Sequence, residues 1–152
     1  MVNSVLVLVI LVGMSVSGCV KVAEESKNSE IETQQAKAAN CPGCDLSYSN
    51  LSYTRLNGAN LKDANLSYAQ LKKANLNGAN LSGAQLTGAN LTGANLNNAN
   101  LNRANLSRAK LISAQLVNTK LISANLSGAN LNGANLCNAL MPDGTISHRG
   151  CE

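Results

Sequence analysis

Cysteine is the residue type in this sequence that is best suited to chemistry. Histidine, the other common choice, occurs only once, at His148. The segment Cys41-Pro42-Gly43-Cys44 has the two-residue spacing of thiol–disulfide exchange centres. The same spacing can supply two ligands to zinc, but zinc needs about two more, and none lies nearby in the sequence. A structural disulfide at the end of a folded unit is the third interpretation. The elements that hold the two cysteines must decide among these.

An apolar segment without charge, Val5 to Gly18, precedes another cysteine, Cys19. The segment is too short for a membrane-spanning helix, which needs roughly 20 residues, but it suits the apolar part of a secretory signal. Val16-Ser17-Gly18-Cys19 resembles the lipobox of bacterial lipoproteins, although no Lys or Arg precedes the apolar segment. The resemblance implies a signal peptide over residues 1–18 and lipidation of Cys19. Ordinary secretory cleavage beside the same small residues is the alternative.

Residues 19–40 are polar and charged and show no sustained apolar periodicity. Such a composition is typical of a flexible tether, here between an anchor and a folded body. Together with the lipobox resemblance, it predicts an exported, membrane-anchored lipoprotein that faces the periplasm or another extracytoplasmic space.

The composition excludes several classes of protein. Among the 152 residues there is no Phe or Trp, and the only aromatics are three Tyr. A conventional globular core is therefore not expected, because aromatics normally supply much of its buried area. Charged residues make up only 13%, which argues against a highly charged disordered chain. The net charge of +4 is too small to indicate nucleic-acid binding by itself.

A strict five-residue repeat dominates the rest of the chain. Leucine occupies every fifth position from Leu46 to Leu136, nineteen in all, and Met141 continues the series as a twentieth centre. Two residues before each centre the chain has Ala at 16 of 20 positions; the exceptions are Cys44, Ser49, Thr54 and Thr119. One residue before the centre, Asn is the commonest residue.

Neither regular structure can bury leucines at this spacing. On an α-helix a five-residue step rotates about 140°, so the leucines would spiral over every face. On an uninterrupted strand an odd step alternates between the two faces. A corner every five residues removes the conflict: a short extended segment points Ala and Leu inward and Asn outward, and the next two residues turn the chain. Glycine is frequent at the second of these, as the sharp turn favours.

With these features, residues 44–143 resemble the pentapeptide-repeat family, as twenty units of the pattern Ala-Asn-Leu-x-x. The resemblance implies an all-β fold, a right-handed quadrilateral β-helix with four repeats per coil and about five coils. The predicted organisation is a signal peptide over 1–18, a tether over 19–40, the β-helix over 41–143 and a C-terminal cap over 144–152. His148 is expected to be an exposed residue of that cap.

The implied coil also limits how the cysteines can pair. Cys44 and Cys137 would lie roughly 22 Å apart along the rod, whereas a disulfide needs Cα atoms within about 7 Å. Within one chain the feasible disulfides are therefore Cys41 with Cys44 and Cys137 with Cys151. Both would staple an end of the rod, and export favours their oxidation. A redox centre at Cys41 and Cys44 remains the alternative function.

No catalytic constellation, cofactor motif or metal-ligand cluster is present in the sequence, so we expect a non-enzymatic protein. Most outward positions carry polar residues, but in one coil several are apolar or cationic, and these form a candidate interaction belt. Its members are apolar or cationic: Arg103, Arg108, Lys110, Ile112, Val117, Lys120 and Ile122. An apolar belt rimmed by cations could contact a partner protein or an anionic membrane surface, although ordinary surface variation would give the same pattern.

Some members of the family imitate DNA and inhibit gyrase, but that role requires negative charge. Residues 44–143 contain eight cations and only three anions. Direct nucleic-acid binding is also not expected, because the cations are scattered and aromatics are scarce. We therefore predict an exported, lipid-anchored structural or protein-interaction module. Tyr48 and Tyr68, which are 20 residues apart, are expected to stack in one column on its surface.

Overall fold

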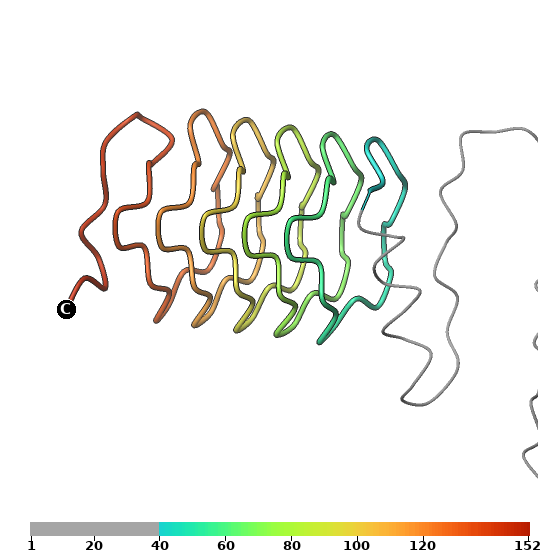
Figure 1. Cartoon of the computed structure of the whole chain (residues 1–152), viewed down its shortest axis with the longest axis horizontal. Coiled ribbons are helices and arrows are strands. Elements are labelled where there is room, and N and C mark those ends of the chain that lie inside the picture. Colours follow the sequence, from blue (N-terminus) through green and yellow to red (C-terminus); the bar gives the residue numbers. More distant parts are fainter. Residues whose placement is uncertain (1–39) are drawn as a thin grey trace, which may run out of the picture.

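The computed structural model describes residues 40–152, which form a rod of stacked coils (Figure 1). Within these residues there is no helix, and the strands are single-residue bridges that recur every five residues. The parallel bridges run from Asn40↔Asn60 to Lys120↔Leu140, and each joins residues 20 positions apart. Each coil therefore contains four repeats, and the predicted four-sided β-helix is confirmed. The predicted signal peptide, Cys19 and the predicted tether up to residue 39 lie outside the described residues.

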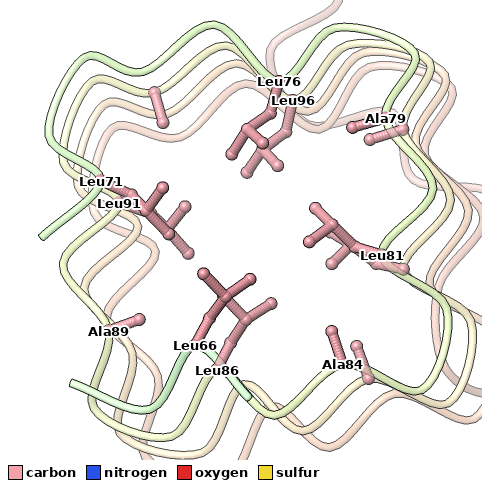
Figure 2. Close-up of a cluster of buried hydrophobic side chains, with 14 of the residues drawn as sticks. Leu66, Leu71, Leu76, Ala79, Leu81, Ala84, Leu86, Ala89, Leu91 and Leu96 are labelled. Atoms are coloured by element: carbon pink, nitrogen blue, oxygen red, sulfur yellow. The ribbon is translucent and has the colours of Figure 1, made fainter. Parts of the chain in front are cut away.

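Positions in a repeat are numbered from its central leucine, so that Ala is at −2, Asn at −1 and the turn at +1 and +2. The four sides of the rod are named by their centres. Side 1 contains Leu66 and Leu86, side 2 Leu71 and Leu91, side 3 Leu76 and Leu96, and side 4 Leu81 (Figure 2). Leu101, 20 residues after Leu81, is also on side 4.

Three main-chain hydrogen bonds join each repeat from Leu46 to Leu121 to the repeat below it in the next coil. On side 1, for example, the Leu66 N–H donates to Gln85 O at 2.7 Å and the Tyr68 N–H to Thr87 O at 2.9 Å. In the opposite direction, the Gln85 N–H donates to Ala64 O at 2.9 Å. The ladder therefore has a polarity: towards the C-terminal end each repeat offers two donors and one acceptor.

The corners are turns whose third residue, at position +2, has a positive φ. Every +2 residue from Gly43 to Asn138 has this conformation, which is the property of type II turns. The sequence prediction placed the corner here because of the five-residue spacing and noted that glycine is frequent at this position. In the structure twelve of these twenty residues are not glycine, among them Tyr53 at φ 63° and Arg103 at φ 59°. The stacked ladder fixes the left-handed conformation even where the side chain disfavours it.

The interior is a narrow column of leucine and alanine (Figure 2). Leucines from all four sides meet on the axis, and every central leucine from Leu61 to Leu121 is fully buried. Two inward positions carry threonine, and each hydroxyl is satisfied: Thr54 Oγ1 donates to Leu51 O at 2.7 Å, and Thr119 Oγ1 to Leu96 O at 2.8 Å. The predicted inward direction of Ala and Leu is thus confirmed without any aromatic residue in the core.

The two ends of the rod are closed differently. At the N-terminal end Cys41 and Cys44 form a disulfide, and Cys44 and Leu46 are buried. At the C-terminal end the chain turns back after Asp143, and Leu140 pairs with Ile146 in an antiparallel bridge. This C-terminal segment, residues 144–151, is called the lid below. Residues 40–152 contain no helix long and apolar enough to cross a membrane.

Candidate interaction surfaces

The apolar residues of the predicted belt lie at position +1 on three successive sides of one coil. Ile112 is on side 2, Val117 on side 3 and Ile122 on side 4. Ile122 is 40% exposed, and the other two are half-buried. One coil earlier the same columns carry polar residues, which are Thr92, Asn97 and Asn102. The belt is therefore a local departure from an otherwise polar surface.

The main chain beneath two of these apolar residues is held by the preceding coil. In most repeats the −1 Asn accepts a hydrogen bond from the +1 N–H of its own turn. In the repeats of Val117 and Ile122 the −1 residue is Gln115 or Lys120 instead of Asn, and this bond is not made. Instead the Val117 N–H donates to Asn97 Oδ1, and the Ile122 N–H donates to Asn102 Oδ1, both at 2.9 Å. The main-chain N–H groups of these two belt residues are therefore both hydrogen-bonded.

The cations of the belt are all exposed, and they end a long neutral stretch of the rod. Residues 74–102 contain no charged side chain, whereas Arg103, Arg108, Lys110 and Lys120 follow within one coil. Because the four sides face different directions, the structure does not gather the predicted belt into one patch. It brings together Arg103 and Ile122, which line the same hollow on side 4.

This hollow has a volume of about 340 Å³ and extends over several coils. Its +2 column reads Asp63, Gly83 and Arg103, and Gly83 leaves space between the two charged residues. The Asp63 carboxylate occupies part of this space, because it covers the direction in which a side chain at Gly83 would point. Sequence reasoning missed the hollow. The sequence did contain a signal for it: Gly83 lies 20 residues after Asp63 and 20 residues before Arg103.

Charge in the hollow is mixed and unneutralised. Lys62 and Arg103 are positive and Asp63 is negative, and no ion pair joins them within residues 40–152. Apart from Ile122 and Gly83, the rest of the lining consists of polar residues, which are Ser82, Asn100, Asn102 and Ser123. The hollow therefore exposes hydrogen-bonding groups and charges of both signs.

The three tyrosines lie on the first two coils and are exposed. The rings of Tyr48 and Tyr68 stack with centroids 5.2 Å apart, which confirms the predicted column. Lys73 Nζ lies 6.0 Å from the centroid of the Tyr53 ring, a cation–π distance. Both contacts join side chains 20 residues apart in adjacent coils, so they tie the first coil to the second.

The remaining cysteines form two disulfides, one at each end of the rod. The Cα atoms are 5.5 Å apart for Cys41 and Cys44, and 4.8 Å apart for Cys137 and Cys151. Cys44 is only 2% exposed because it occupies an inward −2 position. Burial and the lack of any helix N-terminus near it in residues 40–152 disfavour the redox alternative.

His148 lies exposed in the lid. In the described part of the chain, no group of three or more His, Cys, Asp or Glu side chains could hold a metal ion.

Comparison with known families agrees with this geometry. A family model described as pentapeptide repeats matches in eight copies, over residues 39–78, 79–114 and 104–141. The chain belongs to the pentapeptide-repeat family. The fold of this pentapeptide-repeat protein is accordingly the right-handed quadrilateral β-helix that the family resemblance implies. No curated protein matches the chain.

Solved structures of other pentapeptide-repeat proteins are similar to this one. A protein from the Arabidopsis thaliana thylakoid lumen is 31% identical, with a TM-score of 0.65; the match covers 69% of this chain and 71% of that one. A protein from Nostoc PCC 7120 is 36% identical, with coverage of 72% and 74% and a TM-score of 0.38. Rfr23 from the cyanobacterium Cyanothece 51142 is 29% identical, with coverage of 68% and 91% and a TM-score of 0.37.

Proposed function

We propose that this pentapeptide-repeat protein is exported, anchored by lipid at Cys19, and presents a non-enzymatic interaction surface outside the cytoplasm. Support for export comes from the apolar segment Val5 to Gly18 and the lipobox-like residues that end at Cys19. A further support is that the similar Arabidopsis thaliana protein comes from the thylakoid lumen, which is an extracytoplasmic space. The rod would then be a rigid spacer, because its core is continuous from Leu46 to Leu136.

The belt is the observation that carries the proposed interaction. Ile112, Val117 and Ile122 keep apolar area in contact with water at positions where most other coils carry Ser, Thr, Asn or Lys. Burial of such area against a partner is favourable, and the surrounding cations would add electrostatic steering. The three residues face three directions. A flat bilayer could not cover all of them at once, so this geometry favours a protein partner over a membrane surface.

Lipidation is tested by metabolic labelling of the full chain with a fatty-acid analogue, with Cys19→Ser as the comparison. We expect label and membrane association in the wild type and loss of both in the variant. Equal labelling of the two proteins would contradict the assignment of Cys19. A secreted, unlabelled wild-type protein would instead support ordinary secretory cleavage.

The belt is tested by replacing Ile112, Val117 and Ile122 with Ser together. A matched control replaces three +1 residues that precede the belt and lie outside the hollow, as Asn77→Ser, Thr87→Ser and Thr92→Ser. Both proteins would be cross-linked in native membranes and the attached proteins identified by mass spectrometry. We expect the belt variant to lose a cross-linked partner that the control retains. If the wild type, the control and the belt variant cross-link alike, the belt is not an interaction surface.

A further inference from the structure

The main chain of the lid pairs with only two sides of the last coil. The Leu136 N–H donates to Arg149 O at 2.9 Å, and the Asn138 N–H donates to Ser147 O at 2.9 Å, both on side 3. On side 4 the Met141 N–H donates to Thr145 O at 2.7 Å. The main chain of the lid pairs with these two sides only, where the chain has turned back at the C-terminal end of the rod (Figure 1). One lid side chain reaches further: Arg149 Nη2 donates to Leu131 O on side 2 at 2.8 Å, and this leaves the inter-coil donors and acceptors of side 2 unused.

Sides 1 and 2 of the last coil therefore present an open edge of the ladder. Within residues 40–152, none of its inter-coil donors or acceptors has a partner. The donors are the N–H groups of Leu126, Gly128, Leu131 and Gly133, and the acceptors are the carbonyls of Ala124 and Ala129. One coil earlier all the equivalent groups are bonded; the Leu106 N–H, for instance, donates to Asn125 O at 2.8 Å.

The hydrophobic core is also open at this edge. Leu126, Ala129 and Leu131 are only half-buried, whereas Leu106 and Leu111 in the coil above are fully buried. Exposed core side chains next to unpaired main-chain groups are an unfavourable end for a β-fold and a template for pairing with another strand. The surface therefore combines apolar contact area with a directional set of hydrogen bonds.

We propose that this open edge binds an extended segment of a partner protein, which adds half a coil beneath sides 1 and 2. Each side offers two N–H groups and one carbonyl. An extended main chain that runs in the direction of the coil supplies the matching two carbonyls and one N–H, as every internal repeat does. The segment should carry aliphatic residues five apart over Leu126 and Leu131, with small residues beside Ala124 and Ala129. This site is separate from the belt.

A second copy of this chain fits the edge less well. If two C-terminal ends met face to face, the four N–H donors of each chain would meet an edge with only two carbonyl acceptors, so half of the donors would stay unpaired. Head-to-tail stacking would require Leu46 and Leu51 of the second copy to cover Leu126 and Leu131. Leu46 and Leu51 are each only 4% exposed, so they have little free surface to offer.

Hydrogen exchange of the full chain gives the first test. In the protein alone we expect the amides of Leu126 and Leu131 to exchange rapidly and those of Leu106 and Leu111 to be protected. Protection of Leu126 and Leu131 at every protein concentration would show that the chain covers its own edge. Protection that grows with concentration would show that a second copy covers it. Either result overturns the proposal.

The second test uses a peptide with the sequence of residues 124–133, Ala-Asn-Leu-Ser-Gly-Ala-Asn-Leu-Asn-Gly, titrated to millimolar concentration and followed by amide NMR shifts. We expect saturable shifts at Leu126, Gly128, Leu131 and Gly133. A peptide N-methylated at both −1 Asn residues loses the bonds to Ala124 and Ala129, and it should bind about tenfold more weakly. No shifts at the edge, or equal binding of both peptides, would overturn the proposal.

A pair of charge-matched variants separates edge binding from electrostatics. Leu131→Lys places an ammonium group in the apolar part of the edge, whereas Asn132→Lys adds the same charge on an outward position of the same repeat. We expect the first change to weaken peptide binding at least about tenfold and the second to change it by less than about twofold. Equal effects of the two variants would locate the binding elsewhere. Circular dichroism of both variants verifies that the coils remain folded.

Discussion

The ring of Tyr68 lies between the ring of Tyr48 and the backbone of Gly88. Its centroid is 5.2 Å from that of Tyr48, with an interplanar angle of 11°. On the other side, a Cβ added to Gly88 would lie 2.6 Å from Tyr68 Cε1. All three residues occupy the +2 column of side 1, so a glycine in one coil makes room for an aromatic ring of the coil before it.

Gly88→Ala should therefore destabilise the protein more than an alanine at another corner. Both Gly88 and Gly78 have a positive φ, which costs about 1 kcal/mol for a residue with a Cβ. At Gly78 nothing lies within 4 Å of the added Cβ, so only this backbone cost applies. At Gly88 the ring must also move. Urea denaturation should show the larger loss of unfolding free energy for Gly88→Ala, and the difference should vanish in a Tyr68→Ala background.

The depth of a leucine along the rod should set the cost of its removal. Leu91 is fully buried in the middle of the core, and Leu91→Ala should cost about 2–5 kcal/mol. Leu131 is half-buried at the open edge, so Leu131→Ala should cost less than half as much. Equilibrium denaturation of the two variants measures the difference. Equal losses would contradict the assignment of sides 1 and 2 as an open end.

Removal of the C-terminal disulfide should loosen the lid and leave the coils intact. Cys137 and Cys151 are 14 residues apart, and a bridge closing a loop of this length contributes about 3 kcal/mol. In a Cys137→Ser, Cys151→Ser protein, the amides of Leu136 and Asn138 should exchange faster, because they donate to lid carbonyls. Exchange at Leu96 should not change. Faster exchange throughout the rod would instead show that the lid and the coils unfold as one unit.

Acid should weaken the turn that leads into the lid. The Thr145 hydroxyl donates to Asp143 Oδ1 at 2.7 Å and the Thr145 N–H donates at 3.0 Å, and these bonds lower the pKa of Asp143 below its ordinary value of 3.8. The carboxylate therefore supports the turn above pH 3.8, and this support is lost as the pH falls through the lower, folded-state pKa.

An NMR titration can follow this change through the Thr145 amide and the Asp143 carboxyl. Asp143→Asn keeps an acceptor oxygen but cannot titrate, so the shift of the Thr145 amide in that variant should be independent of pH over the same range. An Asp143 carboxyl that titrates at or above its ordinary value would contradict the hydrogen-bonded turn.

The sequence by itself determined the local geometry of this protein. A leucine every fifth residue, with Ala two positions before it, cannot be buried by a helix or by a straight strand, so the corners and the inward side chains follow from the spacing. Family resemblance then supplied four repeats per coil and so the stacking of Tyr48 on Tyr68. It could not reveal that Tyr53 or Arg103 would take a positive φ, because the ladder imposes that conformation from neighbouring coils.

Tertiary structure alone decided the features that depend on contacts across coils. The hollow on side 4 exists because Gly83 lies between Asp63 and Arg103 in one column, although 20 residues separate each pair in the chain. The open edge exists because the lid runs antiparallel beneath sides 3 and 4 instead of continuing under Leu126. The direction of a short terminal segment depends on a few hydrogen bonds and one disulfide, and these leave no periodic pattern in the residues that make them.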